Sequence, residues 1–222
     1  NAIDFCKELE RFCDCKILEI QENLKTAKVE FKSGVIIDFA STREEYYIKG
    51  GHLPVIKNFG CGLKKDVIRR DFTINTLALA LTGENKYNII DCFNACEDIK
   101  NKKIRILHEK SFIDDPSRIV RAIKFQMRFG FDIEEKTNKL MSEYLLNPDK
   151  TVPLERIKNE LKQYFRIKKS GLYNNIIDKK VFKLICDNPI NDFNETDIEN
   201  ISLYLDLSEL WFIYITLLFE FV

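Results

Sequence analysis

One segment of this chain carries a helix signal at both of its ends. Asp115 and Pro116 favour a helix start, because proline is accepted at the first helical position, where no intrahelical hydrogen bond is lost. Apolar side chains then recur every three or four residues up to Gly130, which is typical of a helix end. The pattern predicts an amphipathic helix from Pro116 to Gly130. Such a helix must bury its apolar face against neighbouring elements.

The chain before about residue 92 combines a helical pattern with strand patterns. Residues 2–12 have helical spacing, and Ala27–Phe31 then alternates between apolar and polar side chains. Gly34 separates this run from the apolar run Val35–Ala40, which predicts a β-hairpin. Residues 41–68 are less regular and rich in glycine, so we expect a mobile segment there.

The chain after about residue 94 shows helical patterns only. Besides the helix from Pro116, we expect helices from Asp132 to about Asn147, from Pro153 to about Lys169, and over Leu172–Cys186. The expected fold class is therefore α+β. A small mixed β-sheet with helices is followed by an all-helical part.

Charge and cysteine content narrow the class of protein. Lys plus Arg number 35, as do Asp plus Glu, so a nucleic acid would have to meet a local basic patch. The seven cysteines include no CxxC pair and only two histidines are present, so we expect neither a disulfide framework nor a zinc site. Reduced thiols fit a cytoplasmic protein. The apolar run Leu210–Phe219 is too short to span a bilayer, and no stable protein partner can be inferred.

The helix from Pro116 has the groups needed to read a nucleobase. Its basic residues are spaced by three or four positions and share a face: Arg118, Arg121, Lys124 and Arg128. An aspartate at the helix start accepts hydrogen bonds, and Arg118 beside it donates them. Cytosine and adenine present an amino donor beside a ring-nitrogen acceptor, which this pair matches. Uracil and guanine present a carbonyl beside an N–H instead, which leaves both protein groups without a partner. Each unpaired group costs about 1–3 kcal/mol. A solvated charged face is the alternative interpretation.

Several motifs in order along the chain resemble those of the tRNA nucleotidyltransferase/poly(A) polymerase family. Arg69–Asn75 reads RRDFTIN, Asp114–Arg118 is similar to the family's EDxxR motif, and Arg118–Ala122 resembles its RILRA run. Glu155–Glu160 resembles a later ERxxxE helix, and Asp38–Pro54 also fits. The resemblance covers about residues 1–170, and the ordered set is far more specific than any single motif.

The resemblance implies a domain order and a role for each matched residue. We expect a nucleotidyltransferase head over residues 1–92 without its N-terminal part, a helical neck over 93–170, and the start of a helical body over 171–222. Residues with implied nucleotide contacts lie in the head and the neck. Asp115 and Arg118 would read the base edge, Asp71 would meet the ribose, and Arg70, Arg121 and Lys124 would contact the triphosphate or neighbouring groups.

The implied activity is template-independent addition of C, A or both, from CTP and ATP, to the 3′ end of tRNA. A primer hydroxyl would attack the α-phosphate and pyrophosphate would leave, with Mg²⁺ as the cofactor. A poly(A) polymerase, or an enzyme that adds only CC or only A, would share these motifs. A catalytically silent RNA- or nucleotide-binding protein is the alternative from a different class.

The acidic pair that holds the metal in this family is not found in the sequence. The family's GG…RD and DxD motifs lie upstream of the segment that matches Asn1, and no DxD occurs in the 222 residues. Asp38 occupies a strand position where the wider superfamily often has a third catalytic acid. It is equally well explained as a carboxylate at the edge of a core strand. The metal ligands stay unknown, and we expect this chain to be an inactive fragment of a longer enzyme.

Two further features bear on nucleic-acid binding. Lys124 stands where the family usually has arginine, which keeps the charge but loses the two-pronged geometry of a guanidinium. More basic residues follow in the predicted helix from Pro153, and they fit an RNA backbone or a solvated helix face equally well: Lys158, Lys162, Arg166, Lys168 and Lys169.

Overall fold

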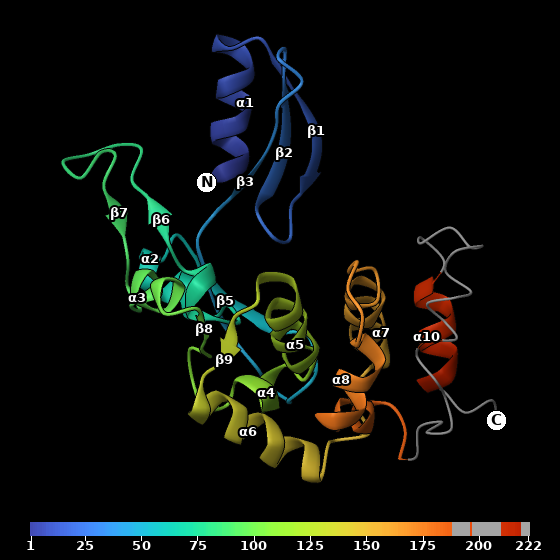
Figure 1. Ribbon diagram of the computed structural model, residues 1–222. Helices are drawn as coiled ribbons and strands as arrows, with labels where there is room; N and C mark the ends of the chain where they lie inside the picture. The colour runs from blue at the N-terminus through green and yellow to red at the C-terminus, as the bar shows by residue number, and fades with distance from the viewer. Residues whose placement is uncertain (188–195, 197–209, 219–222) are drawn as a thin grey trace. The chain divides into compact units, whose positions relative to one another are not determined.

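The computed structural model describes residues 1–187, Thr196 and residues 210–218, and its chain forms two compact units. The first unit comprises Asn1–Tyr46 and Pro54–Arg69, and the second comprises Tyr47–Leu53 and Arg70–Val222. Strands and helices occur in both units, and helices dominate the second (Figure 1). The α+β fold class is confirmed. The predicted head, neck and body boundaries stay a prediction, and part of the segment 171–222 lies outside the described residues.

A helix and a three-stranded sheet build most of the first unit. Helix α1 (Ala2–Phe12) begins at Asn1, whose side chain accepts hydrogen bonds from the N–H groups of Ile3 and Asp4. The sheet is antiparallel in the order β1-β2-β3. Its strands are β1 (Cys15–Gln21), β2 (Thr26–Phe31) and β3 (Ile36–Ala40). Ala27 and Val29 of β2 are buried against Cys6 of α1, as the alternating pattern requires. The β2–β3 hairpin was predicted, and it is confirmed.

Residues 41–68, which were expected to be irregular and mobile, contain three regular elements, and their mobility stays a prediction. Strands β4 (Arg43–Tyr46) and β5 (Val55–Phe59) pair antiparallel, and helix α2 (Leu63–Val67) follows. Polar contacts hold these elements together, because the Asp66 carboxylate accepts from the Arg43 N–H at 2.9 Å and pairs with Arg69 at 2.9 Å. Contacts of this kind leave no apolar periodicity in the sequence.

The loop between β4 and β5 belongs to the second unit, where glycine permits close packing. The Gly51 N–H donates to the Asp114 carbonyl at 2.9 Å. Gly51 has a φ of +74°, and a Cβ at this position would lie 2.3 Å from Cγ2 of Val152. Both the backbone conformation and the lack of space therefore require glycine here.

The second unit combines short strand pairs with a set of packed helices. Strands β6 (Ala78–Leu79) and β7 (Ile89–Ile90) pair antiparallel, and β8 (Lys103–Ile104) and β9 (Asp132–Ile133) pair parallel. The remaining elements are η1 (Thr73–Asn75), α3 (Ala95–Lys100), α4 (Ser111–Asp114), α5 (Ser117–Phe129), α6 (Glu135–Leu146), α7 (Leu154–Tyr164), α8 (Leu172–Asp178), η2 (Val181–Leu184) and α10 (Leu210–Leu218).

The expected central helix is confirmed, and three other boundaries need correction. Helix α5 ends at Gly130, which is left-handed with a φ of +67°. Asp132 does not begin a helix, because it lies in β9 and Glu134 caps α6 instead. Helix α7 ends at Tyr164, several residues before Lys169. The helix expected over Leu172–Cys186 is broken, because Lys180 adopts a left-handed conformation between α8 and η2.

Helices α5 and α7 pack side by side in the main hydrophobic core of the second unit. Ile119, Val120 and Ile123 are fully buried on α5, and Ile157 and Leu161 meet them from α7. Arg121 and Lys124 of α5 also face α7, where both pair with Glu160. Within residues 1–187 and 210–218, no helix is long and apolar enough to cross a membrane. The apolar run Leu210–Phe219 lies partly outside the described residues.

Candidate functional site

Asp115 forms the turn between α4 and α5. Its Oδ1 accepts a hydrogen bond from the Ser117 N–H at 3.1 Å and another from the Ser117 hydroxyl at 2.6 Å. These bonds satisfy donors at the start of α5 that have no partner inside the helix. The side chain is buried, so the orientation of its second oxygen is fixed by the protein.

Two arginines converge on this second oxygen. Arg156 of α7 donates to Oδ2 of Asp115 through Nη2, and Nε of Arg118 lies 3.9 Å from the same oxygen. Arg118 is 4% exposed, and its Nη1 donates to the Ser111 hydroxyl at 2.8 Å. Among the described residues, nothing accepts a hydrogen bond from the buried Nη1 of Arg156. The start of α5 therefore brings one buried carboxylate together with two guanidinium groups.

A second charge cluster lies one turn further along α5. Arg121 pairs with Asp71 at 2.5 Å and with Glu160 at 3.1 Å. Lys124 pairs with the same Glu160 at 2.5 Å and donates to Gln163 at 2.8 Å. Burial disfavours the charged form of Arg121, but Asp71 and Glu160 outweigh this effect and raise its pKa above the ordinary value. Glu160 thus holds two cations of α5 in place.

Arg70 and Asp71, the two expected site residues before η1, differ in burial. Asp71 is buried, and its Oδ1 accepts from the Phe72 N–H at 2.9 Å and from the Asn75 amide at 2.8 Å. Arg70 is exposed, and its Nη1 donates to the Asn75 carbonyl at 2.9 Å. The second unit therefore brings Asp71 and Arg121 into direct contact. Nucleotide contacts of these residues stay a prediction.

Asp38 lies in the first unit, in the middle of β3. Its side chain is 79% exposed, and the nearest cation is Lys28, 3.8 Å away. No group of three or more His, Cys, Asp or Glu side chains in the described part of the chain is placed to hold a metal ion. Asp38 and the other described carboxylates therefore do not fit a Mg²⁺ site by themselves, and we assign no catalytic step to a metal here.

Comparison with known proteins finds the family that this chain resembles. Residues 2–105 match the model of the Poly A polymerase head domain. An A-adding tRNA nucleotidyltransferase from Geobacter sulfurreducens is 47% identical over 141 residues, which is 64% of this chain and 16% of that protein. This chain is therefore similar to enzymes of the tRNA nucleotidyltransferase family. A second such enzyme, from Aquifex aeolicus, is 37% identical over 171 residues, which is 75% of this chain and 20% of that protein.

The likeness to the family extends to its solved structures. The structure of a CCA-adding enzyme in apo form II matches with a TM-score of 0.80 and 31% identity. The match covers 92% of this chain and 48% of that one. This chain thus spans a fifth or less of the two curated relatives and about half of the solved neighbour.

Three residues that contact the expected site had no role assigned from the sequence. Arg156 and Glu160 lie in the family's ERxxxE pattern, and their four-residue spacing places them on one face of α7. Gln163 adds a third contact one turn later, and the motif does not include it. The spacing could have shown that these side chains share a face. It could not have shown that this face meets Asp115, Arg121 and Lys124 of α5.

The environment of His108 should make the stability of this chain depend on pH. Burial and the nearby Arg118 lower the pKa of His108 below its ordinary value of 6.5, and Asp114 opposes this shift. Below pH 6.5 the unfolded chain therefore binds more protons than the folded chain. We expect the free energy of unfolding to fall as the pH drops through this value, and His108→Gln to remove part of that fall.

Urea unfolding on either side of pH 6.5 checks this expectation. Asp114→Asn should steepen the dependence, because it removes the anion that favours the protonated imidazole. An unchanged pH dependence in His108→Gln would show that other groups cause it.

Proposed function

We propose that the whole protein is a template-independent RNA nucleotidyltransferase that adds C, A or both to the 3′ end of tRNA from CTP and ATP. The observation that carries this proposal is the buried Asp115 carboxylate at the start of α5, held beside Arg118 and Arg156. The ligands in the solved structures of similar proteins support this proposal. Solved relatives contain CTP, ATP or, in a Thermotoga maritima CCA-adding enzyme, tRNA.

The pair formed by Asp115 and Arg118 selects bases that present an amino donor beside a ring-nitrogen acceptor. The Ser117 N–H holds one carboxylate oxygen and the Ser111 hydroxyl holds the guanidinium, so both groups are oriented before the nucleotide arrives. The carboxylate accepts from the amino group of cytosine or adenine, and the guanidinium donates to the adjacent ring nitrogen. Uracil or guanine would bury unpaired groups in this pocket, which costs about 1–3 kcal/mol for each.

The proposal extends to Mg²⁺ and to location. Transfer of a nucleotidyl group with release of pyrophosphate develops negative charge, which divalent ions neutralise in enzymes of this kind. The described residues of this chain do not supply the ligands, so the metal is proposed for the whole protein only. We place the protein in the cytoplasm, where tRNA is available and where its seven free thiols would stay reduced.

Addition of A alone is a second candidate function. Three relatives, 47%, 37% and 40% identical to this chain, carry the name A-adding tRNA nucleotidyltransferase. Asp115 and Arg118 match cytosine and adenine equally, so the base-reading geometry fits both functions.

An extension assay with the whole protein tests the proposal and separates the two candidates. The substrates are tRNAs that end before CCA, after the first C and after CC, each offered the four nucleotides singly with Mg²⁺. A CCA-adding enzyme extends all three tRNAs, whereas an A-adding enzyme extends only the tRNA that ends in CC. Absence of extension with every tRNA would contradict the proposal and favour a silent binding protein.

A further inference from the structure

A groove lies between α5 and α7 in the second unit, away from the start of α5. Its volume is about 530 Å³. Cations of α5 and of the segment just after α7 line it, together with an aromatic ring and an amide: Arg121, Lys124, Phe125, Arg128, Gln163 and Arg166. No carboxylate lines this α5–α7 groove.

The two outer arginines give the groove its charge. Arg121 and Lys124 are matched by Asp71 and Glu160, as described above. Arg128 and Arg166 are exposed, and neither has a carboxylate within 4.0 Å among the described residues. Each instead contacts an aromatic ring, since Arg128 lies 5.4 Å from the Phe129 ring centre and Arg166 lies 6.0 Å from that of Trp211.

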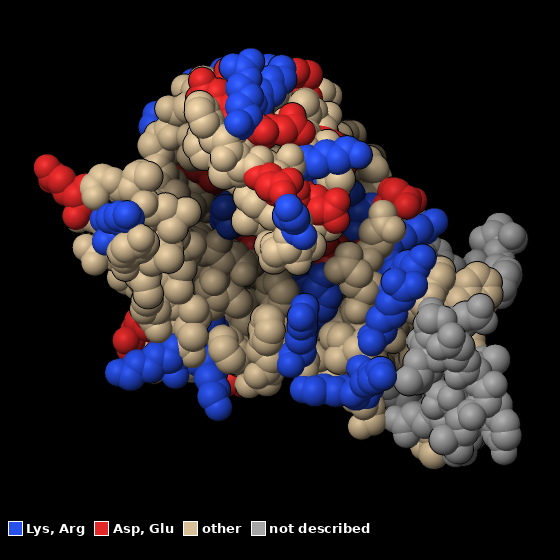
Figure 2. Space-filling view, turned by 90° about the horizontal axis from the view of Figure 1, so that it is seen from above, with Lys and Arg blue, Asp and Glu red and all other residues tan. Residues whose placement is uncertain are grey.

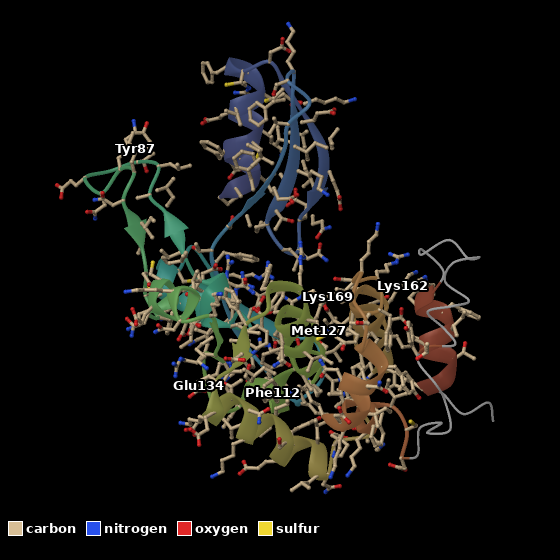
Figure 3. All side chains as sticks on the ribbon, viewed as in Figure 1. Tyr87, Phe112, Met127, Glu134, Lys162 and Lys169 are labelled. Atoms are coloured by element: carbon tan, nitrogen blue, oxygen red, sulfur yellow. The ribbon has the colours of Figure 1, made fainter. Side chains whose placement is uncertain are left out.

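The neighbouring cations extend this positive surface. Lys162 lies 4.1 Å from the Trp211 ring centre between α7 and α10, and Lys169 donates to the Met127 carbonyl at the end of α5 (Figure 3). Lys and Arg side chains gather at the lower right of Figure 2 with no acidic side chain among them. In a chain with a formal net charge of zero, such a local surplus is a site for a polyanion.

The outer part of the groove, at Arg128 and Arg166, favours a phosphodiester backbone over a nucleotide triphosphate. A triphosphate in this class of reaction is bound together with divalent metal, which needs carboxylate ligands. The groove has no such ligands, but it has guanidinium groups that bind phosphate oxygens in pairs. The Phe125 ring in its wall offers an apolar contact for a sugar or an unstacked base.

The groove also lies at a suitable distance from the base-reading pair. Arg128 is ten residues after Arg118 on the same helix, which corresponds to about 15 Å along the axis. Stacked nucleotides are spaced by about 3.4 Å per phosphate, so this distance spans a few nucleotides. A strand whose end lies near Arg118 therefore reaches the groove.

We propose that the α5–α7 groove binds the phosphodiester backbone of the single-stranded 3′ end of the acceptor RNA, through Arg128 and Arg166. The assignment rests on the proposed function. It adds a site to the base-reading pair and names the part of the RNA that the site contacts.

Salt-dependent binding of RNA tests this proposal on the 222-residue chain. The probe is a fluorescently labelled single-stranded RNA ending in C-C, titrated at about 50 to 200 mM salt. Arg128→Gln combined with Arg166→Gln should weaken binding about tenfold or more. The slope of log affinity against log salt should decrease in magnitude by about 1.4, or about 0.7 for each lost phosphate contact. Both side chains are exposed, so the thermal unfolding midpoint should be unchanged.

A matched control removes the same charge elsewhere. Arg11 of α1 and Lys139 of α6 are exposed and lie outside the groove. Arg11→Gln combined with Lys139→Gln should leave both the affinity and the salt slope as in the unmodified chain. Equal losses in the control and the groove variant would overturn the proposal, since they would show a nonspecific effect of net charge.

Three more outcomes would overturn it. The first is an unchanged salt slope in the groove variant, and the second is no RNA binding by the unmodified chain. The third is a loss of CTP and ATP affinity with RNA affinity intact, which would make the groove a triphosphate site. The measurement involves no catalysis, so its result is independent of the extension assay. RNA binding that depends on Arg128 and Arg166 would support the groove even if the whole protein added no nucleotide.

Discussion

Asp115→Asn is expected to abolish the preference of the whole protein for CTP and ATP over UTP and GTP. The amide oxygen can still accept from Ser117, so the start of α5 is retained. The amide nitrogen then replaces the oxygen that faces Arg118 and Arg156, and it opposes the amino group of cytosine or adenine. Two opposed donors at about 1–3 kcal/mol each correspond to a loss of roughly 100-fold in relative kcat/KM. Single-nucleotide addition with each of the four nucleotides measures this ratio.

Ser117→Ala is the matched control for this variant. It removes the hydroxyl that donates to Oδ1 of Asp115 and leaves Oδ2 unaltered. We expect a modest loss of stability, of about 1 kcal/mol, with nucleotide selectivity intact. If Asp115→Asn folds and still prefers CTP and ATP, then Asp115 does not read the base.

Glu160→Gln is expected to lower the free energy of unfolding by about 2–3 kcal/mol. The substitution removes the anion that Arg121 and Lys124 share, and the Lys124 side chain is only 8% exposed. A buried cation without its partner is strongly destabilising, and the partial exposure of Arg121 reduces the effect somewhat. Urea unfolding followed by circular dichroism measures the change.

Two further variants show whether the charge pairing is the cause. Glu155→Gln changes an exposed carboxylate of the same helix, whose hydrogen-bond partner is Asn159, and should have little effect. Glu160→Gln combined with Lys124→Met should be more stable than Glu160→Gln alone, because no unpaired cation stays buried. A double variant that is less stable than the single variant would point to lost packing instead of lost pairing.

Local sequence signals were enough to predict α5 and the β2–β3 hairpin. Proline and glycine at the ends of α5 act through the backbone of a few residues, and the hairpin shows in side-chain alternation. Strands β4 and β5 were missed because Asp66, more than twenty residues from Arg43, holds them through polar contacts. Helix breaks such as the one at Lys180 also depend on backbone geometry that no residue type there signals.

The candidate site, too, could be predicted only in part from the sequence. Arg118, Arg121 and Lys124 could be predicted to share a face, because their spacing follows the helical repeat. Their partners could not be predicted, since Glu160 lies 39 residues from Arg121 in the sequence. Only the packing of α7 against α5 reveals that the acid of one helix neutralises the cations of the other.

The loop Tyr47–Leu53 limits how the two units can be expressed as separate recombinant proteins. It joins two strands of the first unit, yet its Gly51 is bonded to Asp114 in the second. No single cut in the polypeptide therefore yields either unit with all of its residues. A chain that starts at Arg70 would lack the segment that covers Val152, and a chain that ends at Arg69 would carry that segment with nothing to pack against. A separately expressed first unit should instead replace Tyr47–Leu53 with a short turn between β4 and β5.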